Sequence, residues 1–360
     1  MRVWIAGGGT GGHVYPGLAV VQALRAADDP EVVYVGSEGG IEEALAARAD
    51  VPFVGIPAGG LHGVRPARAV QNVFKLVRGW WAACKFGYRE RPSALFATGG
   101  YASVPVALAA WVLRVPILVY LPDIEPGLAV RFIARLATKV AVTVPESRAY
   151  LPDRKTVETG YPVRAEFRDA EPEAARRALG LSPDEPVLLV MGGSRGARSI
   201  NQALEEILEQ VLELSQVVHL TGELDWPRVS GVGSRLADRL KVRYRAYPYL
   251  HDMGQALAAA DLVVCRAGAS TLGELPFFGL PAVLVPYPHA WRYQRVNAEW
   301  LTERGAAVML RDEQLFDRLL PTLRALLTDE ERLRRMAAES RAVSRPNAAA
   351  RLAETLLSLP

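Results

Sequence analysis

The stretch MRVWIAGGGTGGHVYPG (residues 1–17) predicts how the first half of the chain begins to fold. Its apolar run VWIA (3–6) is typical of a buried strand, and GGGTGGH (7–13) then places five glycines before a helical stretch. Glycine is used where the backbone needs a positive φ or must approach another group closely. A glycine loop between a strand and a helix also presents N–H groups at the positive end of the helix dipole. The stretch therefore predicts a strand–loop–helix unit that cradles an anion.

The loop fits neither standard nucleotide-binding fingerprint. It lacks the lysine of G-x-x-x-x-G-K-[ST], and its G-x-G-x-x-G match through Gly7, Gly9 and Gly12 is weak by itself. The acidic residue expected about twenty positions later would be Asp28 or Asp29, which fall in a turn before the next strand. We therefore interpret the loop as an anion cradle of another kind.

The composition is that of a folded α/β protein with room for two domains. The chain has 360 residues, 50% of them hydrophobic, a mean hydropathy of +0.09 and a formal net charge of +3. This length suffices for two full cores, and so mild a charge does not indicate a nucleic-acid partner. Cys84 and Cys265 lie far apart, which fits a reducing compartment and offers no metal-binding spacing. Because a strand begins within two residues of the N-terminus, we expect no secretory signal.

The apolar segment 101–122 has the length of a membrane span, but its sequence favours another structure. Arg114 lies near its middle, and two prolines interrupt it. We expect a helix over 104–113 and a buried strand over 117–121, because short apolar runs are typical of parallel strands.

Apolar runs of strand length alternate with helical stretches along the chain, in two series. The first series comprises residues 3–6, 32–35, 53–56, 94–97, 117–120 and 140–143. The second series comprises residues 187–191, 217–220, 242–247, 262–265 and 282–287. Such alternation predicts parallel sheets with helices on both faces. The predicted fold class is α/β, with two doubly wound, Rossmann-like domains that face a cleft.

A segment rich in proline and glycine, residues 145–165, separates the two series and indicates a hinge. We expect an N-terminal domain over residues 1–160, a C-terminal domain over 161–342 and a C-terminal helix over 343–360 that packs back across the junction. Each domain opens with a strand that runs into glycines, and each carries a later glycine loop, TGGYAS or RAGAST. In such domains, ligands bind at the carboxyl ends of the strands.

In the second half, the segment 265–298 carries many of the polar groups. Gly268 to Thr271 ends a strand and begins a helix, so its N–H groups and hydroxyls can hold a diphosphate. Glu274, one turn into that helix, is either a stabilising first-turn acid or an acceptor for the two hydroxyls of a ribose. In GGSRGARSIN (192–201), Ser194 either caps a helix or donates to a phosphate. The polar run PYPHAWRYQRVNA suits sugar hydroxyls or a solvated helix start.

Together these segments resemble, over nearly the whole chain, the MurG family, the UDP-N-acetylglucosamine–N-acetylmuramyl-(pentapeptide) pyrophosphoryl-undecaprenol N-acetylglucosamine transferases. The matching stretches are GGGTGGHVYPGLAV, ATGGYASVP, TGYPVR, GGSRGARSIN and CRAGASTLGE followed by RYQRVNA. Glycine loops in this order are more specific than any one of them alone. The resemblance implies a two-domain glycosyltransferase of the B type. Its N-terminal domain would bind the lipid-linked acceptor, and its C-terminal domain the sugar nucleotide.

The resemblance also implies roles for individual positions. The residues expected to contact the donor or acceptor diphosphate are Thr10, Gly11 and Gly12. Those expected to contact the nucleotide diphosphate are Arg164 and Ser194. The backbone of Leu250 is expected to meet the uracil, and Gln294 to hold the sugar. The run expected to bind phosphate and ribose is Ala269, Ser270, Thr271, Leu272, Gly273 and Glu274.

The chemistry of the implied reaction gives His13 a role. Transfer with inversion needs a base that takes the acceptor's hydroxyl proton while UDP leaves, and histidine, with an ordinary pKa of about 6.5, can do this at neutral pH. The alternative is that His13 only orients the loop. The leaving diphosphate must also be stabilised, and the sequence has no Asp-x-Asp pair. We therefore expect helix N-termini and Arg164 to stabilise it, with no catalytic metal and no cofactor.

Two departures from the family pattern fall near the expected sugar site. The family typically has His-Glu-Gln-Asn after the fifth strand, where this chain has Tyr120-Leu121-Pro122-Asp123. Asp123 takes the place of the asparagine and can accept from a sugar hydroxyl, but it cannot donate as an amide does. The family's paired glutamines appear here as Tyr293-Gln294. These changes concern acceptor or sugar specificity more than the nucleotide site.

The segment NVFKLVRGWWAACKFGYRER (72–91) interleaves aromatic and aliphatic residues with lysine and arginine. This pattern suits the boundary of an anionic bilayer, and it equally suits a buried helix with a charged outer face. A lipid-linked substrate favours the first interpretation. We therefore expect residues 73–89 to attach the protein peripherally to the cytoplasmic face of the cell membrane, where a cell-wall synthesis complex is a further expected partner.

Three functions remain open on the sequence. The first is transfer of N-acetylglucosamine to lipid I, giving lipid II, in the peptidoglycan synthesis that serves cell shape and division. The second keeps the fold but uses another lipid or a soluble aglycone as acceptor, which the departures at 120–123 and 293 favour and the diphosphate cradle opposes. The third is a non-catalytic subunit that binds a nucleotide sugar. The presence of His13, Glu274 and Gln294 in one chain argues against this third function.

Overall fold

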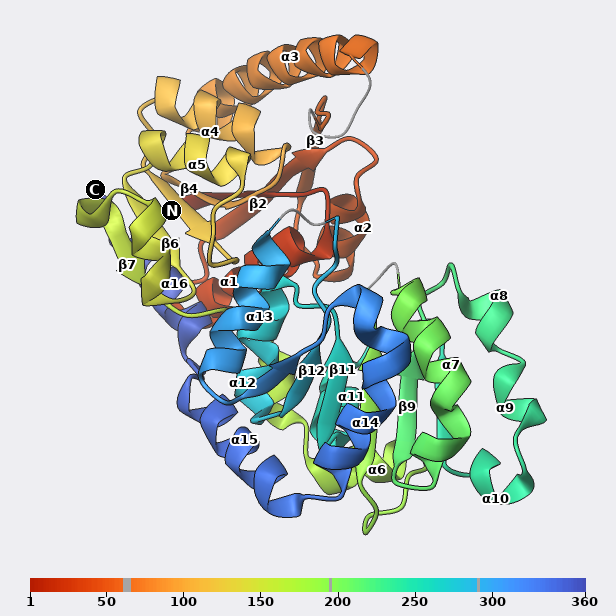
Figure 1. Cartoon of the computed structure of the whole chain (residues 1–360). Coiled ribbons are helices and arrows are strands. Elements are labelled where there is room, and N and C mark those ends of the chain that lie inside the picture. Colours follow the sequence, from red (N-terminus) through yellow and green to blue (C-terminus); the bar gives the residue numbers. More distant parts are fainter. Residues whose placement is uncertain (61–65, 194–195, 290–291) are drawn as a thin grey trace. The chain divides into compact units, whose positions relative to one another are not determined.

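The computed structural model describes residues 1–60, 66–193, 196–289 and 292–360. The chain divides into two compact units, one formed by Met1–Arg164 with Arg345–Pro360 and the other by Ala165–Ser344. Each unit contains one parallel sheet with helices packed on it (Figure 1). The predicted α/β class with two doubly wound domains is confirmed.

The first unit holds a seven-stranded sheet in the order β3-β2-β1-β4-β5-β6-β7. Its strands are β1 (Arg2–Gly7), β2 (Glu31–Ser37), β3 (Phe53–Ile56), β4 (Ala94–Gly99), β5 (Ile117–Leu121), β6 (Lys139–Val142) and β7 (Thr156–Glu158). All neighbouring strands are parallel. The order is that of a Rossmann-like sheet extended by one strand, so β1 and β4 lie side by side at the point where the order reverses.

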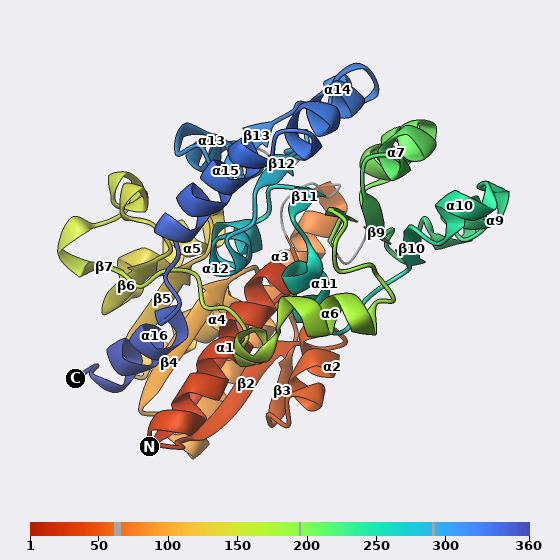
Figure 2. The same cartoon turned by 90° about the horizontal axis from the view of Figure 1, so that it is seen from below.

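Helices cover both faces of this sheet. They are α1 (Gly11–Ala27), α2 (Ile41–Arg48), α3 (Pro66–Glu90), α4 (Ser103–Val112), α5 (Leu128–Leu136) and α16 (Ala348–Leu357), with short 3₁₀ helices at Pro145–Tyr150 and Asp153–Lys155. Alternate strand residues face opposite sides, so Ile5 packs in the core under α1, α2 and α16, whereas Trp4 packs in the core under α3, α4 and α5. Figure 2 shows α1 and α16 in front of the sheet.

The second unit holds a six-stranded parallel sheet in the order β10-β9-β8-β11-β12-β13. Its strands are β8 (Val187–Met191), β9 (Gln216–Leu220), β10 (Tyr244–Tyr247), β11 (Leu262–Cys265), β12 (Ala282–Leu284) and β13 (Ala307–Met309). Its longer helices are α7 (Arg198–Leu212), α13 (Tyr293–Glu303), α14 (Leu315–Leu327) and α15 (Glu330–Ala342). The shorter ones are α6 (Pro172–Ala178), α8 (Trp226–Val229), α9 (Val232–Arg235), α10 (Asp238–Lys241), α11 (Met253–Ala259) and α12 (Glu274–Phe278). The 3₁₀ helices are η3 (Ala165–Asp169), η4 (Ala269–Leu272) and η5 (Asp312–Gln314).

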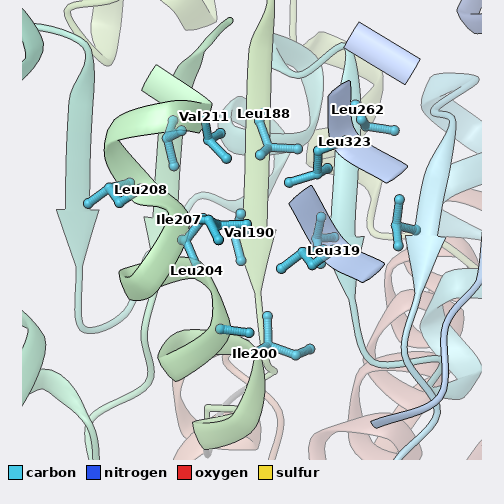
Figure 3. Close-up of a cluster of buried hydrophobic side chains, with 14 of the residues drawn as sticks. Leu188, Val190, Ile200, Leu204, Ile207, Leu208, Val211, Leu262, Leu319 and Leu323 are labelled. Carbon is cyan, nitrogen blue, oxygen red and sulfur yellow. The ribbon is translucent and has the colours of Figure 1, made fainter. Parts of the chain in front are cut away.

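The core of the second unit shows why α7 forms where it does. Its apolar residues recur three or four positions apart, at Ile200, Leu204, Ile207 and Val211, and so form one helix face. This face packs on alternate residues of β8, where α14 adds its own leucines (Figure 3). The packing fixes the N-terminus of α7 at the carboxyl end of β8.

Two strands were not predicted. β7 lies within the segment interpreted as a hinge and pairs with β6, and β13 pairs with β12. Each has three residues, too few to give a visible apolar period.

Segment 101–122 forms α4 and β5, as predicted. Across the described ranges, no helix combines the length and the hydropathy that crossing a bilayer requires. The C-terminal helix α16 belongs to the first unit, where Leu352 and Leu356 join the core beneath α1.

Candidate active site

Two glycine loops of the first unit meet at the carboxyl edge of its sheet. One follows β1 and the other follows β4, and these strands are neighbours. A Cβ atom at Gly100 would lie 2.2 Å from the carbonyl oxygen of Gly8, so the two backbones touch. Gly9 and Gly100 have φ values of +87° and +78°, which side chains other than glycine rarely adopt. The structure therefore explains one glycine in each motif, Gly9 and Gly100, and brings the two motifs together.

Thr10, Gly11, Gly12 and His13 form the start of α1. Thr10 is the exposed N-cap residue, and the other three lie half-buried in the first turn. The Nδ1 atom of His13 lies 3.1 Å from Oγ1 of Thr10, and the hydroxyl of Thr98 donates to the His13 carbonyl at 2.5 Å. The helix N-terminus and the imidazole thus lie on the same turn.

Burial lowers the pKa of His13 to about 4, an effect that the carboxylate of Glu42 opposes in part. His13 is therefore neutral at pH 7. In the tautomer with its proton on Nδ1, it donates to Thr10, and Nε2 keeps the lone pair that a general base needs. Glu42, which lies beneath the loop, was not singled out from the sequence.

Tyr120 and Asp123, two of the residues that depart from the family pattern, lie in different environments. Asp123 follows β5 and is half-buried at the carboxyl edge of the sheet. Tyr120 points into the core, where its hydroxyl lies 2.7 Å from Oγ1 of Thr143 and donates to the Gly160 carbonyl at 3.2 Å. Burial raises the pKa of Tyr120 well above its ordinary value. Tyr120 is thus a core residue, and Asp123 is the departure that lies at the edge of the sheet.

Arg164 ends the N-terminal segment of the first unit, which also includes Arg345–Pro360. Its guanidinium carbon lies 5.0 Å from the ring centroid of Tyr15, within the range of a cation–π contact. Tyr15 lies on α1, one turn from the glycine loop. Arg164 therefore packs against α1, the helix that follows the glycine loop.

In the second unit, the predicted phosphate and ribose run forms a tight turn after β11. Ala269, Thr271 and Leu272 are buried, whereas Ser270, Gly273 and Glu274 are half-buried. The hydroxyl of Thr271 donates to the Gly268 carbonyl at 2.6 Å and closes the turn. Gly273 is the N-cap residue of α12, and Glu274 is its first residue.

Arg266 ties this turn to the neighbouring loops. Its guanidinium donates to Ser199 of α7 at 2.7 Å and to the Val285 carbonyl at 3.3 Å, and it pairs with Asp312 of η5. Its guanidinium also lies over the ring of Tyr287, 5.3 Å from the centroid. Arg266 belongs to the CRAGASTLGE motif, but its partners Ser199 and Asp312 lie 67 and 46 positions away, so these contacts could not be predicted from the sequence.

Gln294 and Asn297 lie one turn apart on α13. The side-chain oxygen of Gln294 accepts from the backbone N–H of Tyr287 at 2.8 Å, and the Asn297 amide donates to the Ala267 carbonyl at 3.1 Å. Asn297 is fully buried and holds α13 against the turn after β11. The structure thus brings Gln294 to the same edge of the sheet as the predicted phosphate run. Ser194 lies outside the described residues.

Leu250 lies half-buried between β10 and α11. Two strands separate β10 from β11 in the sheet, so this segment forms a different part of the edge from the Gly268–Glu274 run. The next two residues, His251 and Asp252, line a cavity of about 460 Å³ together with Glu166, Asp169, Ala170 and Gln255. A volume of this size falls in the range of small-molecule sites.

A polar network lies at the first turn of α7, the helix that follows Ser194 in the sequence. His219 of β9 lies between the hydroxyl of Tyr244 (2.9 Å) and the side-chain oxygen of Asn201 (3.0 Å). The Asn201 amide donates in turn to Asp225 at 2.8 Å, and Arg198 donates to the same carboxylate at 3.0 Å. This network fixes the first turn of α7. Within the same described ranges, no group of three or more His, Cys, Asp or Glu side chains is arranged to hold a metal ion.

Comparison with known proteins gives a consistent result over the full chain. The glycosyltransferase family 28 N-terminal domain matches residues 3–142, and the glycosyltransferase family 28 C-terminal domain matches residues 187–352. The UDP-N-acetylglucosamine--N-acetylmuramyl-(pentapeptide) pyrophosphoryl-undecaprenol N-acetylglucosamine transferase of Roseiflexus sp. (strain RS-1) is 43% identical over 100% of this chain and 95% of its own. The protein of that name from Desulforudis audaxviator is 41% identical over 97% and 95%. The crystal structure of Acinetobacter baumannii MurG superposes with a TM-score of 0.76 at 25% identity, over 99% of both chains.

The two doubly wound sheets, each with glycine loops at its carboxyl edge, define the class as a two-domain glycosyltransferase of the B type. Within that class, the chain belongs to the MurG family of glycosyltransferase family 28.

Proposed function

We propose that this protein transfers N-acetylglucosamine from UDP-N-acetylglucosamine to undecaprenyl-pyrophosphoryl-N-acetylmuramyl-pentapeptide, converting lipid I to lipid II with inversion. The observation that carries this proposal is the full-length similarity to relatives named for that reaction, 43% identical in the first case. The geometry supports it, because both units present glycine-rich turns and helix starts at the carboxyl edges of their sheets, where nucleotide and phosphate ligands bind.

The two units would divide the substrates between them. The first unit would take the lipid-linked acceptor at the loop that precedes α1, where the N–H groups of the first turn face its diphosphate. The second unit would take the sugar nucleotide, with its diphosphate at the turn after β11. Glu274 would accept from the ribose hydroxyls there, and Gln294 would hold the sugar.

His13 would act as the general base. As the acceptor oxygen attacks the anomeric carbon, Nε2 takes the hydroxyl proton, and the bond to UDP breaks with its electron pair on the diphosphate. Because burial keeps its pKa near 4, the imidazole is neutral at pH 7 and has a lone pair on Nε2 that can accept this proton. The charge on the leaving diphosphate would be met by backbone N–H groups and by Arg164, whose guanidinium is held over Tyr15.

A surface of the first unit fits peripheral attachment to the cytoplasmic face of the membrane, where a cell-wall synthesis complex would assemble. We define the apolar face of α3 as Val70, Val73, Phe74, Val77, Trp81 and Tyr88, all exposed and related by the helical spacings of three, four and seven residues. Phe74 and Trp81 are both 67% exposed. Lys75, Arg78, Lys85 and Arg89 are exposed on the same helix. Exposed aromatics beside basic residues are the pattern of a helix that lies on an anionic bilayer.

The alternative function is transfer of the sugar to an acceptor other than lipid I. Asp123 stands where the family has an asparagine, and Tyr120, in place of the family's histidine, is committed to the core through Thr143. A site with these changes would select another lipid or an aglycone acceptor. Direct assay separates the two functions.

The deciding experiment is transfer of labelled N-acetylglucosamine from its UDP donor to a short-chain lipid I analogue, with and without EDTA. We expect lipid II analogue in both cases, because helix N-termini and Arg164 stabilise the leaving group. Product only without chelator would contradict the metal-free mechanism. No product, while calorimetry still detects donor binding, would favour the alternative acceptor or a non-catalytic binding protein.

A further inference from the structure

Glu42 is a buried carboxylate beneath the glycine loop of the first unit. It is the second residue of α2 and is 0% exposed. Its Oε1 accepts from the backbone N–H of Ser37 at 2.9 Å and from the Ser37 hydroxyl. Its Oε2 accepts from the N–H of Gly9 over a longer 3.4 Å. One side chain therefore connects the β2–α2 turn with the loop that precedes α1.

The glycines around Glu42 leave the space that it fills. A Cβ atom at Gly8 would lie 2.4 Å from its Oε1, and one at Gly40 would lie 2.6 Å from the same oxygen. A Cβ atom at Gly36 would lie 2.6 Å from its Cγ. The backbone of the glycine loop thus rests directly on this carboxylate, which explains why Gly8 carries no side chain although its neighbour Gly9 is the residue with positive φ.

Keeping a carboxylate here costs stability. No ion pair joins Glu42 to a cation in the ranges that the structure covers, so hydrogen-bond donors alone offset its loss of water. Burying a charge without a paired ion is unfavourable, and an apolar or neutral side chain would cost less. A group retained at such a cost beside an active site is a candidate for a functional role.

The charge of Glu42 also acts on His13, because it opposes the effect of burial on that imidazole. Among the described residues, the tyrosine and threonine side chains that also contact the loop are uncharged. Tyr34 of β2 donates to the Gly7 carbonyl at 2.8 Å, the ring of Tyr101 lies against Gly9, and Thr10 and Thr98 contact His13. The cation Arg164 lies over Tyr15, farther along α1. A negative charge near the imidazole stabilises it once it has taken a proton.

We propose that Glu42 is a positioning residue for the transfer, which holds the glycine loop through Gly9 and sets its charge toward His13. The kinetic part of this inference rests on the proposed function, whereas the positioning part does not. Glu42 touches neither substrate in this proposal and acts through the loop.

The test uses Glu42→Gln in the full chain, with Glu43→Gln as the matched control. The amide has the volume of the carboxylate and can still accept from Ser37, but its NH₂ group would then face the N–H of Gly9, and the contact with the loop is lost. Glu43 is the exposed next residue, and it accepts from Gly39 without contacting the loop. In Glu42→Gln we expect faster amide hydrogen exchange in peptides covering residues 7–13, and unchanged exchange in Glu43→Gln.

Transfer to the lipid I analogue supplies the second readout. We expect kcat of Glu42→Gln to fall by at least about tenfold, since small misplacements of catalytic groups are costly. In a His13→Ala background, the same change should lower kcat by less than about twofold, because Glu42 acts through His13 and its loop. If Glu42→Gln does not fold, Glu42→Asp keeps the charge, withdraws it from Gly9 and should show the same effects in weaker form.

Two results would overturn the inference. One is loop exchange in Glu42→Gln that equals that of the wild type. The other is a full additional tenfold loss in the His13→Ala background, which would mean that Glu42 acts independently of His13. Failure of the wild-type chain to transfer would count against the proposed function instead, and hydrogen exchange would then decide the positioning role alone.

Discussion

At the scale of single residues, His13 combines two properties that a base for this chemistry needs. Its imidazole is kept neutral by burial, and one ring nitrogen is engaged by Thr10, so the other is oriented. A base whose pKa lies well below neutrality is always in its accepting form at pH 7, but it accepts protons less strongly than an ordinary histidine. The nearby negative charge of Glu42 raises the pKa of His13 and so restores part of its basicity.

Substitutions at His13 and Glu274 should affect different quantities, the first kcat and the second the affinity for the donor. We expect His13→Ala to lower kcat by about 10²-fold or more, as is usual for loss of a general base, and to change the affinity for UDP-N-acetylglucosamine little. Glu274→Ala should instead weaken donor binding by about tenfold or more, because hydrogen bonds to a carboxylate are lost. Steady-state assays and calorimetry measure the two quantities. Equal loss of donor affinity in both variants would remove the assignment of His13 as the base.

At the scale of elements, the loops were predictable and their supports were not. Strand runs followed by glycines identified both loops in each unit, since the signal lies within a few neighbouring residues. Glu42 meets Gly9 across 33 positions, and Arg266 meets Asp312 across 46, so their roles depend on the fold. Strands β7 and β13 were missed because three residues show no period.

The exposure of the aromatic residues of α3 bears on its two interpretations. A buried helix with a charged outer face would hide its aromatic residues, yet Phe74 and Trp81 are each 67% exposed, while Ala83 is buried and Phe86 stacks on Trp4 with ring centroids 5.1 Å apart. The helix is therefore anchored by one side and presents apolar groups on the other. This arrangement favours the membrane interpretation, which binding to vesicles can test.

We expect the double variant Phe74→Ser/Trp81→Ser to bind anionic phosphatidylglycerol vesicles much more weakly than the wild type. Each exposed aromatic that enters the interface contributes on the order of 1–2 kcal/mol, so each loss should lower the partition coefficient by about tenfold. Phe316→Ser is the matched control, because Phe316 is an exposed aromatic of the second unit at 50%. Sedimentation with vesicles measures the effect. Equal binding of the double variant and the control would exclude this face as the membrane contact.

At the scale of the whole molecule, the chain comprises two compact units with separate cores, and each contains a histidine whose pKa is lowered by burial. His13 lies in the first unit and His219 in the second. Burial, aided by the charge of Arg228 and opposed by Asp225, lowers the pKa of His219 to about 3. His219 is 1% exposed to solvent, and its ring nitrogens lie within hydrogen-bond distance of Tyr244 and Asn201. The polar network that fixes α7 therefore carries a group that must stay uncharged in the folded state.

This arrangement makes the stability of the second unit depend on pH. The unfolded chain binds a proton at His219 below a pKa of about 6.5, whereas the folded unit does so only near 3, so the free energy of unfolding falls as the pH drops through this window. Between pH 7 and 4.5 we expect His219 to account for a loss of about 2.5 kcal/mol. Urea unfolding followed by tryptophan fluorescence at several pH values should therefore show a shallower pH dependence in His219→Gln than in the wild type. The variant should also be less stable at pH 7, because Tyr244 and Asn201 lose a partner, so the slope and not the level is the test. Parallel slopes would mean that His219 binds a proton as readily in the folded unit as in the unfolded chain, and that the network holds α7 in another way.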